Sequence, residues 1–134
     1  MGRSSLRAVV DTSVVLAKMF REPGGEVLKA AIADGSVMSD INRAEVINVL
    51  MREGTDPLTA LASAEGVDLE SIPFTSEFLP AMTEIFPHAR RANLSLADCA
   101  CLATAKHLRL PALTADKAWA EIAGELVVEV VVVR

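Results

Sequence analysis

The sequence is poor in the nitrogen and sulfur side chains that build zinc and redox sites. It contains two cysteines and two histidines among 134 residues. Cys99 and Cys101 lie two residues apart within a predicted helix, where side chains at that spacing point in different directions, so we expect neither a disulfide bond between them nor a zinc site. Both thiols are expected to be buried as small apolar groups. His88 and His107 are isolated from other candidate ligands.

Long apolar runs and targeting segments are also missing. No apolar run reaches the ~18 residues of a membrane-spanning helix, and Glu129 interrupts the longest one, residues 126–133. Arg3 and Arg7 are followed by only a three-residue apolar run before Asp11, which is not the pattern of a signal peptide. The sequence therefore predicts a cytoplasmic protein with no membrane association.

Two motifs of phosphate-binding and hydrolytic enzymes are absent. Gly24 and Gly25 lack the lysine and the spacing of a phosphate-binding loop, and no serine stands in the pattern of a nucleophile elbow. The net charge of −5, from 13 basic and 18 acidic residues, argues against a strongly basic surface that coats nucleic acid. It does not exclude a nucleic-acid substrate, because a metal ion bound among acids would reverse the local field.

Short apolar segments alternate along the chain with segments of helical periodicity. We expect strands at residues 6–10, 37–38, 67–72, 111–114 and 126–133, and helices at residues 12–20, 26–33, 41–52, 57–64, 78–89, 95–108 and 117–123. The 51% hydrophobic content and the mean hydropathy of +0.37 indicate a large core, and the length favours a single domain, residues 1–134. Alternating strands and helices predict an α/β fold, in which about five parallel strands are covered by helices on both faces.

Four acidic residues stand beside apolar segments, where a carboxylate is costly unless it is satisfied. Asp11 and Asp116 come just after predicted strands. Glu45 and Asp98 lie on predicted apolar helices. Ligands of open parallel sheets bind outside the carboxyl ends of the strands, and oxygen ligands without clustered His or Cys favour magnesium or manganese over zinc. The four acids are therefore candidate ligands of Mg²⁺ or Mn²⁺.

Each of these acids also has a simpler structural explanation. Asp11 and Asp116 can serve as N-caps of the helices that follow them. In the stretches 42–45 and 95–98 the acid comes three residues after Asn or Ser, which fits a loose capping box. The sequence alone leaves both explanations open for every one of the four.

Four short stretches together resemble a known family. In chain order they are Val9-Val10-Asp11-Thr12-Ser13, Ala44-Glu45-Val46, Leu94-Ser95-Leu96-Ala97-Asp98 and Leu113-Thr114-Ala115-Asp116-Lys117. This set is similar to the motifs of the PIN-domain ribonucleases, most of all to the small toxins of the VapC family. The resemblance extends from Leu6 to Val133. It implies a PIN-like fold, metal-dependent endonuclease action on RNA, a homodimer, and a small cognate antitoxin protein that blocks the site.

The resemblance also implies roles for individual residues. The acidic pocket would consist of Asp11, Glu45, Asp98 and Asp116, which would be the catalytic and metal-binding residues for Mg²⁺ or Mn²⁺. Asp11 and Asp98 are expected to touch the metal directly. Ser13 and Thr114 are expected to orient carboxylates or a water molecule at the metal. The exposed parts of residues 15–20 and 27–32 are candidates for the dimer face.

Several cations are candidate contacts for the phosphates of an RNA strand, although a solvated surface position is the simpler explanation for each. They are Lys18, Arg21, Arg43, Arg90, Arg91 and Lys117. Among them Arg43 stands out, because it lies two residues from Glu45.

Two other functions are compatible with an α/β domain of this size. A receiver-type signalling domain also gathers acids at strand ends, but it needs paired acids after the first strand, and here Thr12 follows Asp11. A catalytically silent module that only binds a partner protein is the second alternative. The presence of all four acids argues against a site that has decayed.

Overall fold

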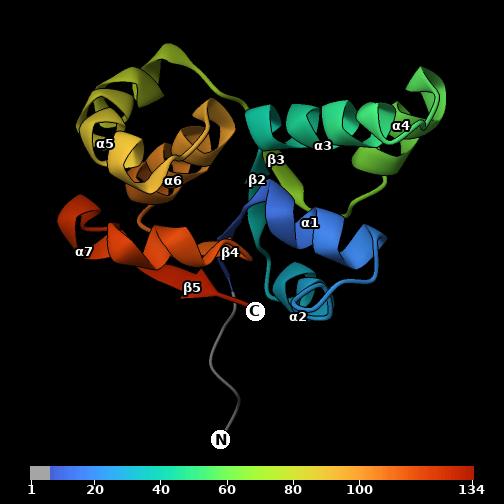
Figure 1. The fold of residues 1–134 in the computed structure, drawn as a ribbon, viewed down its shortest axis with the longest axis horizontal. Coiled ribbons are helices and arrows are strands. Elements are labelled where there is room, and N and C mark those ends of the chain that lie inside the picture. Colours follow the sequence, from blue (N-terminus) through green and yellow to red (C-terminus); the bar gives the residue numbers. More distant parts are fainter. Residues whose placement is uncertain (1–6) are drawn as a thin grey trace, which may run out of the picture.

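A computed structural model of the protein describes residues 7–134 and contains one parallel sheet (Figure 1). Its strands are β1 (Val9–Val10), β2 (Val37–Ser39), β3 (Glu70–Ile72), β4 (Ala112–Thr114) and β5 (Val130–Val132). They lie in the order β3-β2-β1-β4-β5, and every neighbouring pair is parallel. The expectation of about five parallel strands is confirmed.

Seven α-helices and two 3₁₀ segments connect the strands in the described part of the chain. The α-helices are α1 (Thr12–Met19), α2 (Val27–Ala33), α3 (Asp40–Arg52), α4 (Pro57–Glu65), α5 (Leu79–Ala92), α6 (Leu96–Leu108) and α7 (Ala123–Leu126), and the 3₁₀ segments are η1 (Ser76–Phe78) and η2 (Lys117–Glu121). Within residues 7–134, no helix has the length and apolar character needed to cross a membrane.

Both faces of the sheet are covered, because successive residues of a strand point to opposite faces. Val9, Val37 and Ala112 pack with α5, α6 and the buried Trp119 on one face. The residues that follow them, at 10, 38 and 113, pack with helices α1 to α4 on the other face. Figure 1 shows these two groups of helices on opposite sides of the strands. Both free thiols, Cys99 and Cys101, are buried in the first layer, as expected.

The strand order places the two candidate strand-end acids at neighbouring positions. The chain begins in the middle of the sheet with β1, moves outward through β2 to β3, and then crosses back to β4 on the other side of β1. Such a reversal creates a crevice outside the carboxyl ends of the strands, where ligands of open parallel sheets bind. Asp11 follows β1 directly and Asp116 comes two residues after β4, so both lie at this crevice.

Several predicted elements are too long or of another type. Leu6, the first residue of the first predicted strand, lies outside the described residues. The strand expected at 67–72 is only β3, because the N–H of Leu69 donates to the carbonyl of Val67 (2.8 Å) in a tight turn. The strand expected at 126–133 is only β5, because Leu126 ends α7 and Val127 adopts a left-handed conformation with φ 54°.

Two helices also differ from expectation. The helix expected at 117–123 is the 3₁₀ segment η2, and a separate short helix follows it. Helix α5 extends three residues beyond the expected end at 89 and contains Pro87 in its interior. Pro80 is compatible with α5 because it lies in the first turn, where a missing N–H costs little. The longer α5 brings its last turn close to the start of α6, which borders the candidate site described next.

Candidate metal centre

Three of the four acids converge, although they are far apart in the sequence. Asp11 lies between β1 and α1, Glu45 lies in the second turn of α3, and Asp98 lies in the first turn of α6. One carboxylate oxygen from each lies within 4.8 Å of the others. Asp11 is buried and the other two are half-buried.

Asp116 lies at the rim of this group and is exposed. It is the N-cap of η2, where its Oδ1 accepts a hydrogen bond from the N–H of Ala118 (3.0 Å). It does not belong to the group of three whose oxygens converge. Its negative charge nevertheless contributes to the raised pKa of Asp98, so Asp116 belongs to the same electrostatic environment.

The two oxygens of Asp11 have very different surroundings. Oδ2 accepts hydrogen bonds from the hydroxyls of Ser13 (2.6 Å) and Thr114 (3.0 Å) and from the N–H of Ser13 (3.4 Å). Within residues 7–134, Oδ1 accepts only one hydrogen bond, from Asn42 Nδ2 at 3.3 Å. The hydrogen-bonding capacity of Oδ2 is therefore used by the protein, whereas Oδ1 can still bind a cation.

The hydroxyls of Ser13 and Thr114 are themselves fixed by the backbone. Ser13 Oγ accepts from the N–H of Ala115 (2.9 Å), and Thr114 Oγ1 accepts from the N–H of Asp116 (3.1 Å). A hydroxyl that accepts in this way turns its single proton elsewhere, here toward Asp11. This arrangement fits the expected role of both residues as groups that orient a carboxylate.

Asn42 is a site residue that sequence reasoning missed. We expected it to start a capping box, but the N-cap of α3 is Ser39, whose Oγ accepts from the N–H of Ile41 (3.2 Å). Asn42 is fully buried, and its Nδ2 also reaches Thr12 Oγ1 and the carbonyl of Ala97, each at 3.1 Å. It thus links the starts of α1, α3 and α6. A polar amide one turn before Val46, on the buried face of α3, was the available signal.

Burial and mutual repulsion make the acids costly to ionise together. Burial raises the pKa of Asp11 to about 7, and the nearby charge of Asp98 adds to this effect. Burial likewise raises the pKa of Asp98, and the charges of Glu45 and Asp116 add to it. Within residues 7–134 the carboxylate of Glu45 has no hydrogen-bond or ion-pair partner. A cation would remove these costs, and a donor set made only of carboxylate oxygens fits a hard divalent ion.

Comparison with known proteins places the chain in a family. The sequence model described as PIN domain matches residues 8–125. The chain belongs to the PIN domain family. No relative among curated proteins matches it.

Solved structures show the same fold as this PIN domain. A member of the VapBC family of toxin–antitoxin systems, VapBC-5 from Mycobacterium tuberculosis, is 23% identical with a TM-score of 0.66, covering 96% of this chain and 99% of that one. A toxin–antitoxin complex from Klebsiella pneumoniae is 23% identical with a TM-score of 0.62, covering 95% and 98%. FitAcB from Neisseria gonorrhoeae is 25% identical with a TM-score of 0.56, covering 92% and 95%.

Two of the candidate phosphate contacts have structural partners in this PIN domain. The guanidinium of Arg43 donates to the carbonyls of residues 64 (2.6 Å), 67 (3.1 Å) and 69 (2.7 Å) and to Ser71 Oγ (3.1 Å). Arg43 therefore links the segment before β3 to α3, so neither its candidate role as a phosphate contact nor a solvated surface position describes its contacts. Arg91 pairs with Glu125, which also lies 2.7 Å from His88. The side chains of Arg90 and Lys117 have no such partner within residues 7–134.

Proposed function

We propose that this PIN domain is a metal-dependent endoribonuclease and the toxin of a toxin–antitoxin pair of the VapC type, with residues 1–134 as a single domain. The convergence of Asp11, Glu45 and Asp98 within 4.8 Å is the observation that carries the nuclease part. The toxin part is supported by similar structures that are described as toxin–antitoxin proteins.

Magnesium or manganese would be held by Asp11 Oδ1, Asp98 and Glu45. When bound, such an ion neutralises charge on a phosphodiester and makes water a better nucleophile at neutral pH. The protein's own contribution is to hold the ligands still, which Ser13 and Thr114 do for Asp11. Asp116 Oδ2 accepts no hydrogen bond within residues 7–134, so at the rim it can orient a water molecule for attack on phosphorus.

Cleavage of cellular RNA by the purified protein tests this proposal. We expect discrete products in Mg²⁺ or Mn²⁺ that are absent with chelator and absent for Asp98→Asn. The Asn side chain keeps an oxygen that can accept from the N–H of Ser95, as Asp98 Oδ2 does at 2.9 Å, so the fold should survive and circular dichroism can check it. The matched control is Asp68→Asn, which neutralises an exposed acid outside the site. Identical products from Asp98→Asn, or cleavage that continues in chelator, would contradict the proposal.

The partners follow from the same proposal. An antitoxin that blocks the acids is expected to insert a basic side chain beside Asp11 and Asp98, because the local charge is negative. Loss of inhibition when Arg or Lys residues of the cognate antitoxin are replaced would support this docking mode, and unchanged inhibition would contradict it. We also propose that the protein forms a homodimer and acts in the cytoplasm. Light scattering of the purified protein measures its oligomeric state directly.

A further inference from the structure

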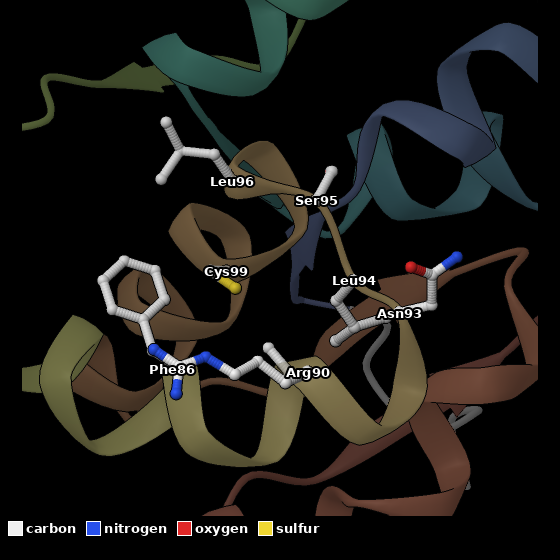
Figure 2. Close-up of a pocket in the computed structure, with 8 residues that line it drawn as sticks. Phe86, Arg90, Asn93, Leu94, Ser95, Leu96 and Cys99 are labelled. Carbon is white, nitrogen blue, oxygen red and sulfur yellow. The ribbon is translucent and has the colours of Figure 1, made fainter.

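A pocket of about 400 Å³ lies between the last part of α5 and the start of α6 (Figure 2). Its walls include Phe86, Arg90 and Asn93 from α5 and its end, and Leu94, Ser95 and Leu96 from the turn and first residue of α6. Its volume is in the range of pockets that bury a small organic group. The proposed function does not use it.

Ser95 connects this pocket directly to the metal centre. The N–H of Ser95 donates to Asp98 Oδ2 (2.9 Å), and Ser95 Oγ accepts from the N–H of Asp98 (3.1 Å). The same residue lines the pocket and holds a candidate metal ligand. The pocket and the candidate metal centre therefore adjoin at Ser95.

The walls combine flat and apolar surfaces with free polar groups. Phe86 and Arg90 are four residues apart, which places them on one face of the last part of α5, and Asn93 follows the end of that helix in a left-handed conformation with φ 55°. Figure 2 shows Phe86 and Arg90 on one side of the pocket and Asn93 on the other. Leu96 is 66% exposed although it is apolar. Within residues 7–134, neither the guanidinium of Arg90 nor the side-chain amide of Asn93 has a hydrogen-bond partner.

We propose that this pocket binds one base of a single-stranded RNA, next to the phosphodiester that is cleaved; this rests on the proposed nuclease function. Proteins that read single-stranded RNA stack its bases on aromatic rings or guanidinium planes and read their edges by hydrogen bonds. Phe86 and Arg90 supply the surface for stacking. Asn93 supplies both a donor and an acceptor for a base edge. The positive charge of Arg90 also makes the pocket complementary to the negatively charged RNA backbone, although the net charge of the protein is −5.

Two variants that should preserve the fold test whether the pocket binds a base. Phe86→Leu keeps an apolar side chain against the core and removes only the aromatic face, and Arg90→Ala changes an exposed residue. The control is Arg109→Ala, which removes an exposed arginine at the opposite end of α6. The affinity for labelled single-stranded RNA is measured by anisotropy with chelator present. KM, kcat and the bases flanking each cut are measured with Mn²⁺.

For both pocket variants we expect a dissociation constant and a KM about fivefold or more above the wild-type values, the lower end of what one base–aromatic stack contributes. The base preference at one position beside the cut should flatten, kcat should change little, and Arg109→Ala should behave as wild type. Wild-type KM and base preference in both variants would overturn the base pocket and leave the nuclease proposal intact. The absence of metal-dependent cleavage by wild type would refute the nuclease itself. Loss of antitoxin inhibition with unchanged RNA kinetics would reassign the pocket to the protein partner.

Discussion

Replacement of Asp11 by Asn should stabilise the metal-free protein at neutral pH while removing its ability to hold a divalent ion. Asp11 is 2% exposed, and burial raises its pKa to about 7 from an ordinary value of 3.8. Below about pH 4 the carboxyl is protonated in both the folded and the unfolded chain, so its ionisation makes no contribution to the free energy of unfolding. Between about pH 4 and pH 7 the folded chain retains a proton that the unfolded chain has released, so stability falls as the pH rises.

The size of this loss follows from the pKa difference. Each pKa unit corresponds to about 1.36 kcal/mol, and a change from 3.8 to about 7 gives a loss on the order of 4 kcal/mol, complete above about pH 8. The Asp11→Asn variant has no ionisable group at position 11, so it does not undergo this pH-dependent loss of stability. Its amide must face Asn42 Nδ2, which lies 3.3 Å from Asp11 Oδ1, and two donors in contact cost about 1–3 kcal/mol. Because that cost does not depend on pH, the informative quantity is the pH dependence of the difference between the two proteins.

Urea denaturation in chelator, from about pH 4 to pH 8, measures this difference. Trp119 is the single tryptophan and is fully buried, so its fluorescence reports unfolding. We expect the wild type to lose stability relative to Asp11→Asn throughout the range. Mn²⁺ at one hundred times its dissociation constant should raise the free energy of unfolding of the wild type by about 2.7 kcal/mol. The free energy of unfolding of Asp11→Asn should not change. A difference that stays constant with pH would refute the assignment of a raised pKa to Asp11.

Three further substitutions test the supporting contacts. Arg43→Ala should lower the free energy of unfolding by about 2–3 kcal/mol, because the guanidinium donates to three carbonyls; calorimetry should show unchanged Mn²⁺ affinity, and weakened Mn²⁺ binding would contradict the structural role. Asn42→Ala should weaken Mn²⁺ binding about tenfold or more in the same titration, because Asp11 Oδ1 loses its protein partner; wild-type affinity would contradict this. Ser13→Ala should cost about 1–3 kcal/mol in urea denaturation, because the N–H of Ala115 loses its acceptor; wild-type stability would mean that water replaces the hydroxyl.

The fold class could be predicted from the sequence because buried parallel strands leave an apolar pattern. The pairs at residues 9–10, 37–38 and 112–113 are apolar at both positions, since one side chain of each pair faces each layer of helices. The ends of the strands could not be predicted in this way. In the apolar run 126–133, Leu126 completes α7 and Val127 adopts φ 54°, a conformation that a β-branched residue rarely takes. Tertiary contacts decide such boundaries.

The candidate site could be predicted in part for a similar reason. Acids beside apolar segments are conspicuous, and each motif supplied one of them. The contacts of two residues could not be predicted, because their partners are distant in the sequence. Asn42 acts on Asp11 across 31 positions. Arg43 is a candidate phosphate contact by sequence, with a solvated surface position as the simpler explanation. Its guanidinium instead donates to carbonyls of the segment before β3, and nothing in the spacing of the chain indicates these acceptors.

Capping and metal binding are compatible explanations for Asp11 and Asp98, because a carboxylate has two oxygens; Glu45 makes no cap, since α3 begins after Ser39. Asp11 caps α1 through Oδ2, Asp98 completes a capping box with Ser95 through Oδ2, and Asp116 caps η2 through Oδ1. Each cap uses one oxygen; the other is left for a cation in Asp11 and Asp98 and for a water molecule in Asp116, which lies outside the group of three. The caps also bring helix N-termini, which carry partial positive charge, to a place crowded with negative charge. An Asn side chain keeps the capping oxygen and removes the charge, so Asp→Asn variants separate the two roles that a truncation to Ala would remove together.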